Sequence, residues 1–116
     1  MELPPPVTGE GTQNFPNGNS YAGHFDQSVF DGFGTYLWKV EGDKYEGEWS
    51  AGKRQGQGKF TWADGSVYDG PWKKDAPHTQ NSKVGIWTQP GGEAATGQWS
   101  NGKLELPQPR DLKTAK

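Results

Sequence analysis

The sequence predicts an all-β protein built as a series of similar β-hairpins. Three observations support this prediction: a motif that returns at steps of 23 to 27 residues, an alternation of glycines with aromatic residues, and turn dipeptides between the alternating stretches. The composition agrees with it, because 13% of the residues are aromatic although only 29% are hydrophobic. Aromatic packing, rather than an aliphatic core, is therefore expected to hold the fold together.

The repeat is visible in two independent marks. The second glycine of a Gly-x-Gly pair falls at positions 11, 34, 58 and 85, and in the last pair Lys83 replaces the first glycine. The tyrosine of a Tyr-x-Gly-x-aromatic motif falls at positions 21, 45 and 68, and Ala95 takes the degenerate fourth position. For both marks the last step is 27 residues, longer than the earlier steps of 23 and 24. This longer spacing predicts a loop insertion that holds Pro77.

Period-two alternation within each unit predicts strands, because alternate residues of a strand share one face. Asn17-Gly18 and Asp64-Gly65 separate such stretches and predict type I′ hairpin turns, in which both central residues have positive φ. Only Phe30 and Phe33 lie outside the aromatic positions of the repeat. The recurring glycines are expected to make room for rings of neighbouring strands. The opposite face should be mostly polar, with Thr35, Glu46, Glu48, Lys59, Thr61 and Asp69.

Charge and cysteine content exclude several classes of function. The chain has 116 residues, no cysteine and a net charge of -2. Without cysteine it has no disulfide, no thiolate metal site and no cysteine nucleophile. The slightly acidic balance argues against nucleic-acid binding. No signal peptide and no 18-residue apolar stretch is visible, so a cytoplasmic location is expected.

No pattern in the chain favours catalysis or a cofactor. His24 and His78 lie far apart in sequence and lack the spacing of metal ligands. Asp43 and Glu46 could imitate a glycosidase pair, but nothing encloses them to raise the pKa of one carboxyl. Gly-x-Gly leads into a strand here, whereas a phosphate-binding loop leads into a helix. We therefore expect no enzyme activity, no cofactor and no metal.

The segment YEGEWSAGKRQGQGKFTWADGSVYDGPW, residues 45–72, closely resembles the MORN (membrane occupation and recognition nexus) repeat. The resemblance covers about residues 9–103 and divides them into four units, 9–31, 32–55, 56–82 and 83–103. It implies a short stand-alone array: an elongated, twisted, single-layer antiparallel sheet of hairpins with an aromatic groove on its concave side. An extended proline-rich segment, residues 1–8, would precede the array, and an extended tail, residues 104–116, would follow it.

The resemblance also implies a non-enzymatic scaffold whose groove binds a peptide or helix of a larger assembly. Ciliary or axonemal assemblies, or other cytoskeletal structures, are the settings that it suggests, with protein partners in a multi-subunit complex. The candidate groove residues are Tyr36, Trp38, Tyr45, Trp49, Phe60, Trp62, Tyr68 and Trp72. The glycines expected to be structural are Gly11, Gly23, Gly34, Gly47, Gly58, Gly70, Gly85 and Gly97.

Other interpretations stay open at this stage. The rings could stack on one another beneath the terminal segments, and the tail could be an anchoring arm or an unanchored end. A peripheral membrane module for acidic phospholipids would need a basic face, for which the recurring pairs 53–54 and 73–74 (Lys-Arg and Lys-Lys) are the candidates. A carbohydrate-binding platform is a third interpretation, against which the missing signal peptide weighs. The first and last strands also favour edge-strand or end-to-end association.

Overall fold

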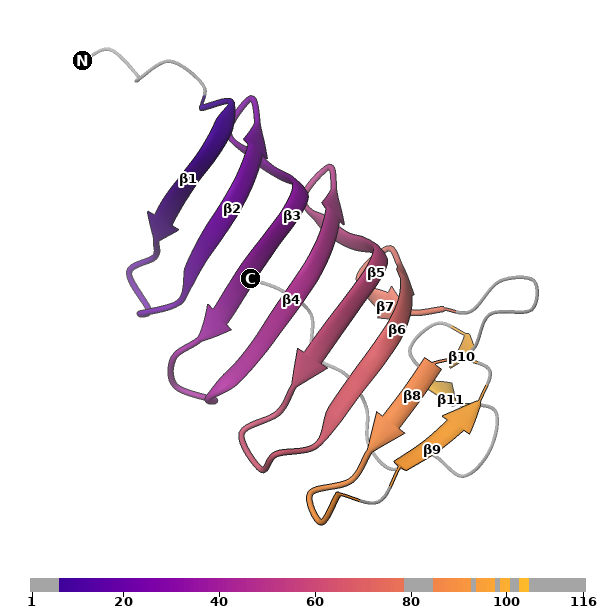
Figure 1. Ribbon diagram of the computed structural model, residues 1–116. Coiled ribbons are helices and arrows are strands. Elements are labelled where there is room, and N and C mark those ends of the chain that lie inside the picture. The colour runs from indigo at the N-terminus through magenta and orange to yellow at the C-terminus, as the bar shows by residue number, and fades with distance from the viewer. Residues whose placement is uncertain (1–6, 79–84, 93, 98, 101–102, 105–116) are drawn as a thin grey trace.

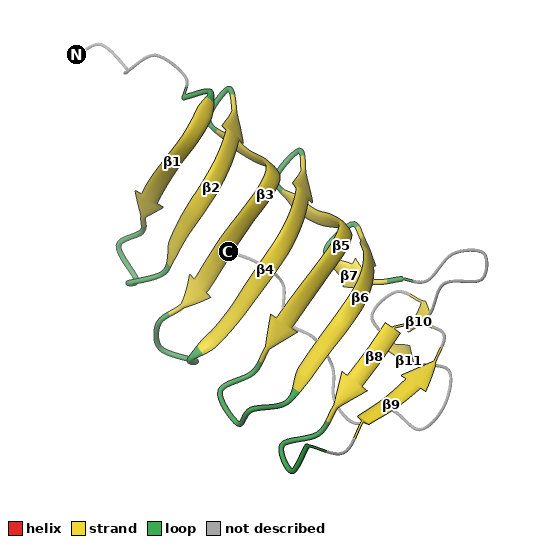
Figure 2. Ribbon diagram, in the orientation of Figure 1, coloured by secondary structure: helices red, strands yellow, loops and turns green. Residues whose placement is uncertain are grey.

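The computed structural model describes residues 7–78, 85–92, 94–97, 99–100 and 103–104. These residues form strands and no helix, as Figure 2 shows. The strands are β1 (Gly9–Asn14), β2 (Ser20–Asp26), β3 (Val29–Trp38), β4 (Asp43–Ser50), β5 (Lys53–Thr61), β6 (Val67–Lys73), β7 (Ala76–Pro77), β8 (Gly85–Thr88), β9 (Ala94–Gly97), β10 (Trp99–Ser100) and β11 (Lys103–Leu104). The predicted all-β class is confirmed.

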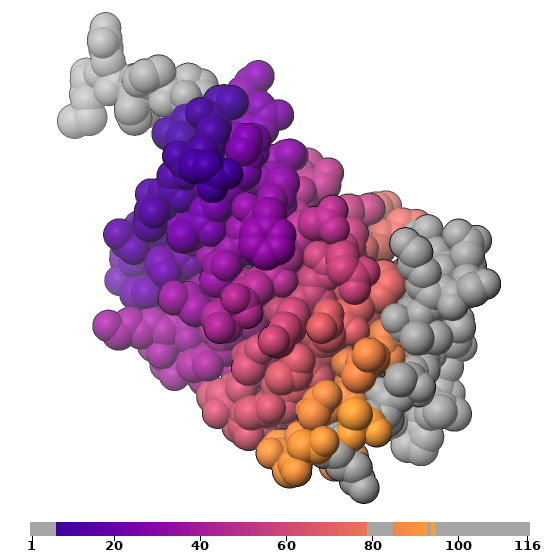
Figure 3. Space-filling view, viewed as in Figure 1, coloured from indigo at the N-terminus to yellow at the C-terminus, as the bar shows by residue number. Residues whose placement is uncertain are grey.

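One open antiparallel sheet contains all of these strands except β10 and β11, which pair with each other. Its strands follow chain order, β1-β2-β3-β4-β5-β6-β8-β9, and β7 pairs with β6. Figure 1 shows this succession of hairpins, and in the space-filling view the parts of the chain follow one another as bands (Figure 3). The single-layer sheet of successive hairpins is therefore confirmed.

The loops at Asn17-Gly18 and Asp64-Gly65 differ from the predicted type I′ turns. Only the glycines have positive φ, 94° at Gly18 and 92° at Gly65. The amides of these glycines donate to the carbonyls of Phe15 and Trp62, both at 2.9 Å, as in a type I turn that ends in a left-handed glycine. The reason lies in the Asn and Asp side chains, because Oδ1 of each accepts the amide two residues further on.

The two-residue turns lie at the opposite ends of the strands, where one repeat joins the next. The central residues have positive φ at Gln27-Ser28, Ala51-Gly52 and Lys74-Asp75, as type I′ turns require. Only one of these three pairs contains glycine, so the usual dipeptide signal is weak. The sequence prediction missed these turns for that reason.

Pro77 lies in a strand and not in the predicted loop. It belongs to β7 and is the register partner of Trp72 in β6. β7 and β8 together take the place of the one strand that follows the two-residue turn in the other repeats. β7 pairs with β6 directly after the turn at Lys74-Asp75, and β8 pairs with β6 again from Ile86, which faces Asp69. A proline is tolerated where a strand is this short and its pairing ends. The segment after His78, the N-terminal residues 1–6 and the tail from residue 105 lie outside the described residues.

Candidate interaction surface

The eight predicted groove residues lie together on one face of the sheet, which we call the aromatic face. A continuous row of register partners crosses six strands, from Tyr21 on β2 through Tyr36, Tyr45, Phe60 and Tyr68 to Trp87 on β8. Trp38, Trp49, Trp62 and Trp72 flank this row. Strand pleating places Trp38, Trp49 and Trp72 there, because each is an even number of residues from the row on its own strand, and Trp62 continues the same alternation just after β5.

The rings of the aromatic face are buried, with exposed fractions of 0 to 4%. They pack mainly edge to face: Tyr45 lies 5.1 Å from both Trp49 and Trp72, at interplanar angles of 85° and 82°. Trp62 and Trp87 continue the series at 4.9 Å. Such geometry places the positive ring edge on the negative ring face. The face is thus a packed aromatic layer with little accessible ring area.

A row of glycines crosses the sheet beneath these rings. Register pairs link Gly11, Gly23, Gly34, Gly47, Gly58 and Gly70 in succession, and Gly85 pairs with Gly97. The Tyr45 ring covers two of them, since a Cβ on Gly47 would lie 2.6 Å from the tyrosine oxygen and one on Gly58 would overlap it. Tyr21 and Tyr68 cover the equivalent glycines of their junctions. The glycines give the tyrosines their space.

Each covering tyrosine also closes a local hydrogen bond. The hydroxyls of Tyr21, Tyr45 and Tyr68 donate to the carbonyl three residues further on, at 2.7, 2.8 and 2.8 Å. The indole Nε1 of Trp49 donates to the Gly34 carbonyl at 3.1 Å, and Trp72 does the same to Gly58 at 3.0 Å. The polar ends of these five rings are therefore bonded to backbone carbonyls.

Burial changes the acidity of these phenols. It raises the pKa of Tyr21 to about 12, with smaller contributions from the charges of Glu10 and Asp31. The pKa values of Tyr45 and Tyr68 are raised as well, mainly by burial. In each case the protonated form suits the dry site, because an ionised phenolate would lose its hydration there.

These pKa values predict unfolding by alkali. Below pH 10 the tyrosines are protonated in both states and their stabilisation is complete. As the pH rises from 10 towards about 12, the unfolded chain releases its phenolic protons first, so the folded state loses stability. Circular dichroism and tyrosinate absorbance, recorded together, should show one cooperative step in this window. Tyrosinate formation near pH 10 with the dichroism unchanged would contradict the expectation.

Arg54 is the charged residue of the aromatic layer. Its side chain is 0% exposed, and the guanidinium lies 4.7 Å from the Trp72 ring centroid and 5.6 Å from that of Phe60. Nε pairs with Oδ1 of Asp75 at 3.2 Å, and Nη2 donates to the Asp75 carbonyl at 2.8 Å. Burial lowers the pKa of the guanidinium, and Asp75 partly offsets this. Cation–π contact and the ion pair together hold the charge inside.

Buried polar residues two positions before the tyrosines tie neighbouring hairpins together. Oδ1 of Asn19 accepts the amide of Lys39 at 3.0 Å, and Oδ1 of Asp43 accepts that of Ala63 at 2.9 Å. Both bonds reach across 20 residues to the loop of the next hairpin. They fix each repeat on its neighbour, because a buried acceptor without its donor would be costly.

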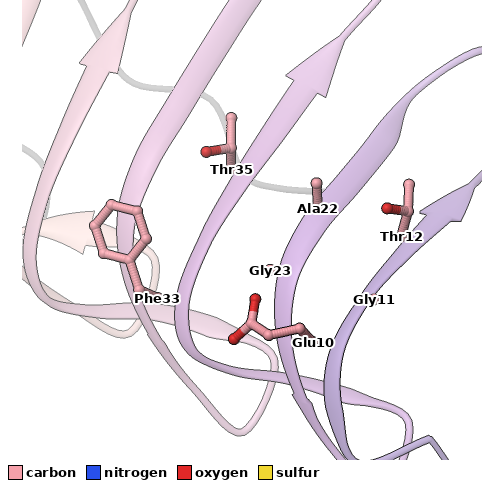
Figure 4. Close-up of a pocket in the computed structure, with 7 residues that line it drawn as sticks. All are labelled: Glu10, Gly11, Thr12, Ala22, Gly23, Phe33 and Thr35. Carbon is pink, nitrogen blue, oxygen red and sulfur yellow. The ribbon is translucent and has the colours of Figure 1, made fainter.

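The opposite face is largely polar, with Phe33, Leu37 and Ile86 as exposed apolar side chains. Thr35, Glu46, Lys59 and Asp69 form one row of register partners on it. Phe33 projects from the same face and is 63% exposed. It borders a shallow hollow of about 490 Å³ over β1 to β3, with Glu10, Ala22 and Thr35 around it (Figure 4).

Sequence reasoning missed that Phe30 belongs to the aromatic layer and that it shares a repeat position with Arg54 and Pro77. Phe30 was placed outside the repeat, yet it stacks on Tyr21 at 3.9 Å with an interplanar angle of 9°. Phe30, Arg54 and Pro77 each follow a tyrosine by nine residues, and this shared spacing is the signal that identifies the position. Because this position holds Phe, Arg and Pro in the three repeats, a search for one recurring residue type does not find it.

Two other kinds of feature are absent from the described residues. No three His, Cys, Asp or Glu side chains of that part gather as metal ligands would. Nor does the described part contain a helix that is both long and apolar enough to span a bilayer.

Comparison with known proteins identifies the repeat. A family model described as the MORN repeat matches residues 21–40, 45–67 and 96–105. Over 68 residues the chain is 37% identical to MORN repeat-containing protein 3 of Xenopus laevis, covering 53% of this chain and 29% of that protein.

Two further relatives are larger proteins. Alsin of Homo sapiens is 31% identical over 96 residues, which cover 78% of this chain and 6% of alsin. Phosphatidylinositol 4-phosphate 5-kinase 1 of Oryza sativa subsp. japonica is 45% identical over 47 residues, covering 40% of this chain and 6% of that protein. The chain thus spans less than a third of each of these relatives. The matched repeats, together with the sheet of hairpins, show that the chain belongs to the MORN-repeat family.

Proposed function

We propose that this chain is a non-enzymatic scaffold module that seats a peptide or helix of a protein partner along its aromatic face. The observation that carries the proposal is the unbroken row of rings across six strands, from Tyr21 to Trp87. MORN repeats are associated with scaffolding and with binding to membrane phospholipids. Tyrosine and tryptophan are also the residues most enriched among binding hot spots.

A partner that binds the aromatic face meets rings that are already packed against one another. Trp38 and Trp49, at 4% and 3%, are among the more exposed members of the layer. Binding therefore requires the side chains of this layer to rearrange, and a rigid surface contact is not enough. In this proposal the rearranged ring row supplies a continuous apolar seat, and the sheet beneath it keeps the seat straight. The setting that we propose is a ciliary, axonemal or other cytoskeletal assembly, on the family resemblance alone.

Site-specific photocrosslinking tests the seat. A benzophenone amino acid replaces Trp38 on the aromatic face or, as a matched control, Phe33 on the polar face. We expect the Trp38 position to form protein adducts in native lysate that excess unmodified chain suppresses, and the Phe33 position to form none. Circular dichroism first checks that both variants are folded. Suppressible adducts from Phe33 alone, or from neither position, would remove the aromatic face as the seat.

Binding to acidic phospholipids is the second candidate, and the relation to a phosphatidylinositol phosphate kinase is the observation that favours it. Of the recurring basic residues, Lys53, Lys73 and Lys74 are exposed, whereas Arg54 is buried against Asp75 and is not available to a headgroup. Three exposed lysines are a small basic patch at about 1 kcal/mol each near an anionic surface. Sedimentation with anionic vesicles that falls with salt and with a triple Lys→Gln change at these positions would favour this candidate.

A further inference from the structure

The edge strand β1 has the sequence and shape of a strand that should receive another strand. Strands β2, β4 and β6 contain Tyr-x-Gly-x-Trp or Tyr-x-Gly-x-Phe, and we call them tyrosine strands. Strands β1, β3 and β5 contain Gly11, Gly34 and Gly58 of the glycine row; we call these residues ladder glycines and the strands glycine strands. At a junction between repeats, a tyrosine strand is followed by the glycine strand of the next repeat. β3 and β5 lie between two tyrosine strands, their own hairpin partner and that of the preceding repeat. In the described structure β1 pairs only with β2.

The backbone of β1 already has the conformation of such a junction. Gly32 and Gly56 stand two residues before their ladder glycines and have φ of 73° and 92°. Residues of the preceding tyrosine strand lie over them: a Cβ would come within 3.2 Å of His24 at Gly32 and 3.0 Å of Glu48 at Gly56. Gly9 has the equivalent place and a φ of 112°, but a Cβ there would meet nothing within 4 Å. Its positive φ fits a neighbour that the described residues do not supply.

The ladder glycine of β1 likewise lacks its covering tyrosine. A Cβ on Gly34 or Gly58 would overlap the tyrosine of the preceding repeat, whereas one on Gly11 would meet Phe25 at 3.4 Å and Val7 at 3.8 Å, which are ordinary contacts. An open pocket of about 380 Å³ lies at this place. Val7 and Phe25 form its apolar walls, and Gln13 stands where the other glycine strands have Tyr36 or Phe60. The ring position over Gly11 is therefore vacant within the described part of the chain.

We propose that the edge of β1 that faces away from β2 binds an extended Tyr-x-Gly-x-Trp or Tyr-x-Gly-x-Phe strand of another protein. The strand adds antiparallel to β1 by backbone hydrogen bonds, as in other cases of strand addition to a sheet edge. The register follows from the junctions inside the chain, where Gly23 faces Gly34 and Tyr21 faces Tyr36. The incoming glycine accordingly faces Gly11, the incoming tyrosine faces Gln13, and the tyrosine ring fills the vacant place over Gly11.

A second copy of this chain is the poorer occupant. Docking end to end would bring β9 to β1, and β9 has Ala95 where a tyrosine strand has its tyrosine. Such a contact would leave the ring position empty. The vacant place therefore selects a partner with an intact tyrosine strand, and this site is separate from the aromatic seat of the central repeats.

A peptide with the sequence of residues 43–50, DKYEGEWS, is the probe, because in the chain itself this segment forms β4 and pairs with the glycine strand β5. Added to the full isotope-labelled chain, it should shift the amide resonances of β1 saturably, with the largest changes at Gly9, Gly11 and Gln13. The same peptide with Tyr45→Ala should bind about tenfold more weakly or worse, because the ring that fills the pocket is gone.

Gly11→Ala in the chain is the matching variant. Its methyl group finds ordinary contacts, so the fold should be unchanged, but the methyl stands where the incoming ring must lie and should abolish the shifts. Gly91→Ala, at a site with nothing within 4 Å, should bind the peptide as the natural chain does. Binding that tolerates both Tyr45→Ala in the peptide and Gly11→Ala in the chain would overturn the proposal. So would the absence of shifts in β1 at saturating peptide, or shifts confined to other strands.

Discussion

Alanine in place of Gly58 is expected to reduce the free energy of unfolding by about 3 kcal/mol, because it forces a methyl group into space that a ring occupies. The new Cβ would overlap the Tyr45 hydroxyl. That hydroxyl cannot simply withdraw, since it donates to the Glu48 carbonyl at 2.8 Å and its ring lies between Trp49 and Trp72. Urea unfolding followed by tryptophan fluorescence measures the loss.

Gly91→Ala is the control for this substitution. Gly91 lies in the loop between β8 and β9, its φ is not positive, and an added Cβ would meet nothing within 4 Å. The free energy of unfolding of this variant should stay within about 0.5 kcal/mol of that of the natural chain. Equal losses at positions 58 and 91 would mean that any glycine-to-alanine change destabilises the chain, and that ring space is not the cause.

Arg54→Ala is expected to cost about 3 to 5 kcal/mol, because it removes one partner of a buried ion pair and empties space between four rings. Asp75 would keep its carboxylate, 17% exposed, without the guanidinium that it faces. Trp72 and Phe60 would also lose the cation above them. The free energy of unfolding in urea, at a pH where carboxylates are ionised, measures the effect.

The equivalent place one repeat earlier suggests how to restore this loss. There Phe30 and Gly52 hold the positions of Arg54 and Asp75, and the Gly52 amide donates to the Phe30 carbonyl as the Asp75 amide does to the Arg54 carbonyl, at 2.9 and 3.0 Å. The double change Arg54→Phe with Asp75→Gly recreates this arrangement and should come within about 1 kcal/mol of the natural chain. Arg54→Phe alone should be less stable, since the Asp75 carboxylate loses the guanidinium and keeps only the residue-54 amide and the distant Lys53. A double variant as unstable as Arg54→Ala would show that the two repeats are not interchangeable here.

The sequence predicted the sheet well because the repeat constrains it strongly. One alternation of Gly34, Tyr36 and Trp38 is weak, but the same alternation recurs at Gly58, Phe60 and Trp62 with the same spacing. A strand register slipped by one residue would turn every ring to the wrong face. Hence the class of fold, the hairpins and the residues that share the aromatic face could all be read from spacing.

The details that escaped prediction depend on contacts between repeats. The positive φ of Gln27-Ser28 and Lys74-Asp75 is set by the pairing of the flanking strands and not by the turn residues themselves. The burial of Arg54 depends on four rings from four different strands, which no short motif encodes. Pattern reasoning therefore assigned Arg54 to a basic surface pair, where its type is most common.

The strict neighbour-to-neighbour order of the sheet also bears on how fast the chain folds. In the nine-stranded sheet no register pair is farther apart in sequence than Val67 and Thr88, which belong to the third and fourth repeats. Loop-closure entropy is thus paid over one hairpin at a time, however many hairpins follow. When whole repeats are added to an array of this kind, its stability grows roughly in proportion to the number of repeats. Its relative contact order, the mean sequence separation of contacts divided by chain length, falls. Evolution can accordingly set the reach of such a rod without slowing its folding.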